Sequence, residues 1–66
     1  MQHTALPDPR PEIARRVRAA SVTAVARDLG IPREQIARLA GGLDVRASTL
    51  ALARDRLALL VEARTQ

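Results

Sequence analysis

The stretch from Ser21 to Gly42 constrains the fold of this chain more than any other segment. It is predicted to form two short helices on either side of a sharp turn at Leu29-Gly30-Ile31-Pro32. At about 100° per residue, the apolar residues of each helix fall on one face and the charged residues on the other. The apolar faces comprise Val22, Val25, Ala26 and Leu29 in the first helix and Ile36, Leu39 and Ala40 in the second. Two such helices joined at a glycine predict a helix-turn-helix unit.

The composition restricts how the rest of the chain can support this unit. The 66 residues include no Phe, Tyr, Trp or Cys, so the core must be built from Leu, Ile, Val and Ala without disulfides or zinc-binding thiolates. A chain of this size buries only about 60% of its unfolded surface, which indicates modest stability without a partner. No signal peptide is evident and no apolar run reaches the roughly 18 residues of a membrane span. A cytoplasmic protein, associated with the nucleoid and not with a membrane, is therefore expected.

A proline-rich arm and one further helix precede the unit. Residues 1–10 are expected to form an extended or disordered arm because prolines recur at alternate positions. Residues 11–66 are expected to form a single domain. Its first helix is predicted to begin at Pro11, which suits a first helical position, and to end near Ala20. The residues that should face the core recur at helical spacing and are Ile13, Val17 and Ala20.

The last helix is predicted to begin at a Ser48 or Thr49 cap and to carry two apolar stripes on roughly opposite sides. One stripe comprises Leu50, Ala53, Leu57, Leu60 and Val61, and the other comprises Leu52, Leu59 and Ala63. The monomer core needs only one stripe, and the spacing does not decide which. The second stripe, Leu52, Leu59 and Ala63, is the candidate dimer interface. The alternative is that the arm or the first helix folds across it. In the preceding loop, Leu43 or Val45 is expected to tuck under the domain.

The positive charge of the chain is concentrated around the helix-turn-helix unit. The formal net charge is +4, and residues 10–46 hold eight Arg against four acidic residues. Such a balance indicates a polyanionic partner. Every basic residue is Arg, which a G/C-rich coding sequence would also explain.

The outward face of the second helix of the unit is predicted to read base edges in the major groove of double-stranded DNA. The candidate residues for base edges are Arg33, Glu34, Gln35, Ala37 and Arg38. Arg33 and Arg38 can each donate two hydrogen bonds to guanine, whereas Glu34 is expected to pair with Arg38 across one helical turn. Contacts to phosphates are expected from Arg15, Arg16, Arg18, Ser21, Thr23, Arg27 and Arg46. The alternative for both sets is an ordinary solvated surface.

This pattern resembles the helix-turn-helix domains of the Cro and lambda-repressor type, also called Xre-like. Ala26, Gly30, Ile36 and Leu39 stand at the spacing of the small, turn and core residues of that family, and the resemblance covers about residues 12–61. It implies an all-α, compact bundle of four or five helices that binds operators as a homodimer and regulates transcription. Two departures are visible. Pro32 stands where a Ser or Thr commonly begins the recognition helix, and a clear fifth helix is absent.

The expected function is therefore sequence-specific DNA binding by a homodimer, with a recognition helix at about residues 32–40 in the major groove. The alternative is a protein-interaction module, or an antitoxin-type or phage-type adaptor, that uses the last helix and binds DNA secondarily. An enzyme is not expected, because the chain has no Cys, a single His in its arm and no carboxylate cluster. No metal, cofactor or small-molecule ligand is indicated by the sequence.

Overall fold

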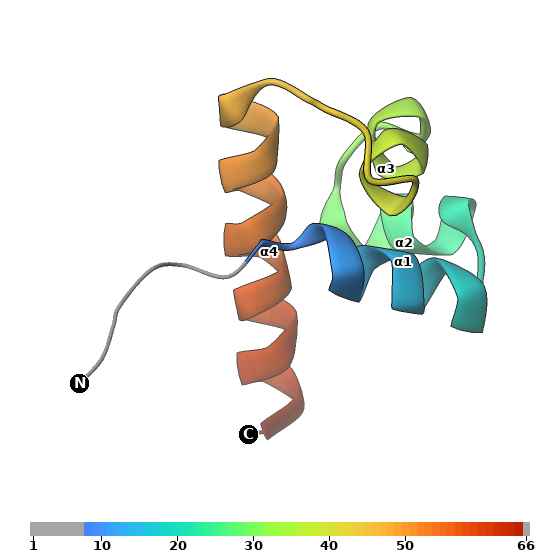
Figure 1. Ribbon diagram of the computed structural model, residues 1–66. Coiled ribbons are helices and arrows are strands. Elements are labelled where there is room, and N and C mark those ends of the chain that lie inside the picture. Colours follow the sequence, from blue (N-terminus) through green and yellow to red (C-terminus); the bar gives the residue numbers. More distant parts are fainter. Residues whose placement is uncertain (1–7, 66) are drawn as a thin grey trace.

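Four α-helices make up the part of the chain that the computed structural model describes, residues 8–65. They are α1 (Arg10–Ala19), α2 (Val22–Leu29), α3 (Arg33–Ala40) and α4 (Ala47–Thr65). The predicted all-α class is confirmed, and residues 8–65 contain neither a strand nor a fifth helix. The first three helices pack against one another, and α4 contacts chiefly α2. Figure 1 shows α4 as a longer helix that stands beside the three short ones.

α1 begins slightly earlier than predicted, because the residues before it support its first turn. Pro9 is buried, and its carbonyl oxygen accepts a hydrogen bond of 3.0 Å from the N–H of Ile13. Asp8 accepts hydrogen bonds from the backbone N–H and the guanidinium of Arg10, which lower the pKa of Asp8. The remainder of the predicted arm, residues 1–7, lies outside the described part of the chain. The prediction that Ala20 faces the core is wrong, because α1 has already ended there and Ala20 is exposed.

Both ends of α2 are capped as the sequence predicts. Ser21 is extended, and its Oγ accepts a hydrogen bond of 3.0 Å from the backbone N–H of Ala24, which satisfies one of the first donors of the helix. At the other end, Gly30 adopts the left-handed conformation with φ of 66°, and its N–H donates to the carbonyl of Ala26 at 2.8 Å. Ile31 then turns back into the core, where its side chain is buried. The predicted cap, glycine turn and Ile31 contact are therefore confirmed.

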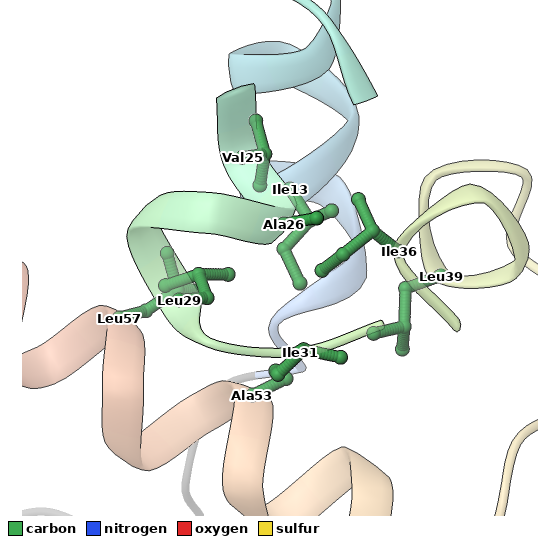
Figure 2. Packing of buried hydrophobic residues seen from close by; sticks show 9 residues of the cluster. All are labelled: Ile13, Val25, Ala26, Leu29, Ile31, Ile36, Leu39, Ala53 and Leu57. Atoms are coloured by element: carbon green, nitrogen blue, oxygen red, sulfur yellow. The ribbon is translucent and has the colours of Figure 1, made fainter. Parts of the chain in front are cut away.

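One apolar core joins all four helices and the turn (Figure 2). Its members are Ile13 of α1; Val25, Ala26 and Leu29 of α2; Ile31 of the turn; Ile36 and Leu39 of α3; and Ala53 and Leu57 of α4. Figure 2 shows Leu29 and Ile31 directed towards the helix that carries Ala53 and Leu57. The end of α2 and the turn after it therefore supply the surface on which α4 rests.

α3 ends at the predicted Gly41-Gly42 pair. Gly42 has φ of 74°, and the N–H of Leu43 closes the end of the helix by donating to the carbonyl of Arg38 at 2.9 Å. In the loop that follows, Val45 packs against the core, whereas Leu43 is exposed. Of the two residues expected to tuck under the domain, Val45 is the one that does so.

The predicted cap of the last helix is wrong. α4 begins at Ala47, and the carbonyl of Arg46 accepts a hydrogen bond of 3.0 Å from the N–H of Leu50. This bond draws Ser48 and Thr49 into the first helical turn, where neither residue has the extended backbone that a capping side chain requires.

The two apolar stripes of α4 are clearly distinguished. Ala53 and Leu57 are buried, and Leu50 and Leu60 pack at the edge of the core, so the stripe that contains them holds α4 on the monomer. The exception is Val61, which remains 50% exposed because the last turns of α4 extend beyond the other helices (Figure 1). The second stripe, Leu52, Leu59 and Ala63, is exposed among the described residues and is not covered by α1. Cover by residues 1–7 of the arm, the other alternative, lies outside the described residues.

Candidate nucleic-acid interface

The outward face of α3 carries all five residues predicted to meet base edges. Four of these side chains are exposed and Gln35 is half-buried; the exposed ones are Arg33, Glu34, Ala37 and Arg38. On the opposite face, Ile36 and Leu39 are each 0% exposed. α3 contacts both α1 and α2 through this buried side. The core therefore fixes which side chains α3 presents to a partner.

A shallow surface hollow lies between the beginnings of α2 and α3. It is lined by Val22, Arg33, Glu34 and Ala37. Two further predicted contact residues, Ser21 and Thr23, flank Val22 in the chain and are exposed. The structure therefore brings the first turn of α2 next to the candidate reading face. The first N–H groups of a helix have no partner inside that helix, so both helix beginnings offer donors near this hollow.

α3 begins without a side-chain cap, which agrees with the expectation drawn from Pro32. The carbonyl of Pro32 accepts hydrogen bonds from the N–H groups of Gln35 at 3.0 Å and Ile36 at 3.1 Å, but its side chain offers no acceptor. The fixed φ of Pro32, −54°, instead restricts how the chain enters the helix. The missing cap removes one polar group that a DNA phosphate could have contacted.

The expected ion pair between Glu34 and Arg38 is not formed. The ion pairs among the described residues involve other side chains. An exposed ion pair across one helical turn contributes only about 0.3–0.5 kcal/mol. This gain does not offset the loss of hydration and of side-chain conformational entropy that the pair would require. Both side chains on α3 therefore remain available to a partner.

Two of the predicted phosphate-binding residues are instead engaged by Glu12. Arg15 donates to the Glu12 carboxylate at 2.9 and 2.6 Å, and Arg16 donates to it at 2.8 Å. These hydrogen bonds lower the pKa of Glu12 to about 2, and those from Arg15 have the larger effect. Arg15 and Arg16 also line a second hollow, together with Asp28 and Leu60, which is distinct from the hollow beside α3.

The remaining predicted phosphate contacts lie on three different elements. Arg18 on α1, Arg27 on α2 and Arg46 in the loop before α4 are exposed, and none of them forms an ion pair with another described residue. Their positive charge is therefore not neutralised locally, in contrast to that of Arg15 and Arg16.

One arginine that the sequence did not single out contacts the turn of the unit. Nη1 of Arg56 donates a hydrogen bond of 2.7 Å to the carbonyl oxygen of Leu29, the last residue of α2. The two residues are 27 positions apart, and no periodicity within α4 indicates which of its charged residues meets α2. Only the packing of α4 on Leu29 and Ile31 reveals this contact.

Comparison with known proteins does not assign the chain to a family: no protein-family model matches it, and no curated protein or solved structure shows a significant match. None of the helices in residues 8–65 combines the length and apolar character that a membrane span needs. In the same residues, no group of three or more His, Cys, Asp or Glu side chains is placed to hold a metal ion.

Proposed function

We propose that this chain is a sequence-specific DNA-binding regulator of the Cro and lambda-repressor type, with α3 in the major groove. The observation that carries the proposal is the geometry of α2 and α3. These two short helices are joined by the left-handed turn at Gly30, share one buried face, and leave the charged face of α3 exposed. An exposed helix of this kind fits the width of the major groove of B-form DNA.

The exposed side chains of α3 offer different hydrogen-bonding partners for bases. Arg33 and Arg38 can each donate in a bidentate manner to O6 and N7 of guanine. Gln35 can bind adenine, and Ala37 can contact the methyl group of thymine. Because Glu34 is not paired with Arg38, its carboxylate is available to accept from N4 of cytosine.

Contacts to the DNA backbone would orient this reading face without selecting a sequence. Ser21 and Thr23 stand at the beginning of α2, where exposed N–H groups and the helix dipole favour a phosphate. Arg18, Arg27 and Arg46 supply charges that no acidic group of the described residues neutralises. Arg15 and Arg16 would first have to exchange Glu12 for a phosphate, so their contribution to affinity is smaller.

The proposed active form is a homodimer that uses the exposed stripe of α4. One reading helix makes too few base contacts to select a site in a genome, whereas two such helices read two half-sites about one helical turn (~34 Å) apart. Leu52, Leu59 and Ala63 provide an apolar surface that the described residues leave uncovered. The proposed function requires no catalytic step, metal or cofactor. A protein that binds DNA in this way would be associated with the nucleoid.

A second candidate function is a protein-interaction module or an adaptor of the antitoxin or phage type. The same exposed side chains favour it, because an apolar stripe can bind a different protein as well as a second copy. In that case DNA binding by α3 would be secondary or absent.

Selection of bound sequences from a random pool of double-stranded DNA tests the primary proposal. We expect an enriched motif of two inverted half-sites at a fixed spacing. Binding without any enriched sequence, at several salt concentrations, would contradict it. A chain that stays monomeric at micromolar concentration and does not bind DNA would favour the adaptor function.

A further inference from the structure

The hollow between the beginnings of α2 and α3 combines apolar and charged side chains. Val22, the first residue of α2, and Ala37, one turn after Arg33 on α3, contribute apolar groups to its lining. Arg33 and Glu34 contribute a cation and an anion to the same lining. The candidate reading face of α3 therefore continues onto an apolar residue of α2.

Val22 is less buried than its place in the helix predicts. Helical spacing puts it on the core face of α2 together with Val25, Ala26 and Leu29, and those three side chains are buried. Val22 is only half-buried: it packs against the edge of the core and also lines the hollow. Packing in the core therefore accounts for only part of this side chain, and the rest is accessible to a partner.

We propose that the hollow receives the C5 methyl group of a thymine and that Val22 is a specificity-determining residue for this base. The inference rests on the proposed function and deepens it, because it adds a residue of α2 to those that read bases. Arg33 lines the same hollow, so the thymine belongs to the base pair next to the guanine that Arg33 binds.

The chemistry of the four bases leads to this assignment. In the major groove thymine presents a methyl group, whereas adenine and cytosine present amino groups and guanine presents two acceptors. Val22 and Ala37 offer no hydrogen bond, so an amino group or an acceptor set against them would lose its water without a replacement. A methyl group loses nothing there and gains by leaving water. Arg33 and Glu34 then serve a neighbouring guanine and cytosine.

Replacement of thymine by deoxyuridine tests the contact directly, because it removes only the methyl group. Duplexes that carry the sequence selected from the random pool are prepared with each thymine of one half-site replaced in turn. Their binding to the natural chain is measured by fluorescence anisotropy at constant salt concentration. At one position the replacement should weaken binding by about threefold to fivefold, as expected for one buried methyl group.

Val22→Ala should make the protein less sensitive to this replacement. At the same position, the ratio of the affinities for thymine and deoxyuridine should fall below about twofold, because most of the apolar contact is lost. Val17→Ala is the matched control: Val17 of α1 is also half-buried against the core, but it does not line the hollow. This variant should retain the full ratio, even if its affinity for all duplexes changes. A purely structural role of Val22 would likewise leave the ratio unchanged.

Val22→Thr keeps the experiment decisive if the alanine variant does not fold, which circular dichroism reports. Threonine preserves the shape of valine but replaces one methyl group with a hydroxyl. This change should also reduce the ratio. A ratio that stays at its natural value in a folded Val22 variant would overturn the assignment of Val22.

Methylation of cytosine provides a second, independent measurement. A cytosine placed at the thymine position should weaken binding, and 5-methylcytosine should recover part of the loss because its methyl group occupies the same place in the groove. Val22→Ala should show a smaller recovery than the natural chain. Equal binding of cytosine and 5-methylcytosine by the natural chain would contradict the proposal.

The two levels of the argument fail in different ways. If the random pool yields no enriched sequence, the proposed function fails and this inference fails with it. If a sequence is enriched but none of its positions depends on a thymine methyl group, α3 still reads DNA and only the role of the hollow is overturned.

Discussion

Arg56 of α4 donates a hydrogen bond of 2.7 Å from Nη1 to the carbonyl oxygen of Leu29 at the end of α2. This bond satisfies one of the last carbonyl groups of α2, which have no partner within the helix, and places a positive charge at the negative end of its dipole. The same guanidinium lies over Gly30, where a built Cβ would be 2.7 Å from Nη1. The fourth helix therefore restrains the turn that sets the direction of α3.

Arg56→Met should destabilise the fold by about 1–3 kcal/mol, because it keeps most of the side-chain stem and removes a hydrogen bond made by a charged group. Urea unfolding followed by circular dichroism measures this change. Arg54→Met is the matched control, since Arg54 lies on the same helix and its nearest ion-pair contact is long, 3.8 Å to Asp55. Equal losses for the two variants would show that the Leu29 contact contributes nothing.

Gly30→Ala should cost more stability than Gly42→Ala, although both glycines have positive φ values of 66° and 74°. Each alanine incurs the cost of the left-handed conformation, about 1–2 kcal/mol. At Gly30 the new methyl group must also displace Arg56, whereas at Gly42 it meets nothing within 4 Å. The difference between the two free energies of unfolding measures the contact with Arg56. A difference of zero would mean that this side chain moves aside without cost.

Ser21→Ala and Ser21→Asp should separate the capping role of this residue from a role in DNA binding. Alanine loses the hydrogen bond to the N–H of Ala24 and should lower stability by about 1 kcal/mol. Aspartate is also a good cap and should preserve stability, but its charge would repel a nearby phosphate and weaken DNA binding. Thermal unfolding and DNA titration of both variants provide the two measurements. Unchanged DNA affinity of Ser21→Asp would place the phosphates away from α2.

Acid should remove a small part of the stability through Glu12. The pKa of Glu12 is 4.5 in the unfolded chain and is lowered to about 2 in the folded chain. The ionised carboxylate therefore contributes its full stabilisation when the pH is above 4.5. That contribution is lost as the pH falls from 4.5 towards 2. The side chains of Glu12 and Arg15 are 38% and 57% exposed, so solvent screening limits the effect to about 1 kcal/mol or less. Glu12→Gln should flatten the dependence of the urea midpoint on pH, and an unchanged dependence would contradict this role of Glu12.

Local signals in the sequence predict much of the helix-turn-helix unit. The Ser21 cap, the Gly30 turn, the return of Ile31 to the core and the apolar faces of α2 and α3 all follow from residue type and helical spacing. Each of these features depends on groups within a few residues of one another. Short-range rules of capping, glycine conformation and periodicity are therefore sufficient to find them.

Features that depend on contacts between elements could not be predicted. The periodicity of α4 contains two stripes, and only its packing on Leu29 and Ile31 shows that Ala53 and Leu57 belong to the core. The Arg56 contact depends on the same packing. For the candidate site, helical spacing predicts the exposed face of α3. The sequence does not show which partner Arg15 takes, although Glu12, with which it pairs, is only three positions away.

Binding of Arg38→Ala to a selected DNA site and to its single-base variants tests the central claim most directly. Loss of a bidentate contact to guanine should cost about 1–3 kcal/mol and abolish discrimination at one base position in each half-site. Arg15→Ala, which also changes an exposed arginine but on α1, should weaken binding less and to the same extent for all sequences. The opposite result, unchanged base preferences in Arg38→Ala or the same behaviour in both variants, would contradict the assignment of α3 as the reading helix.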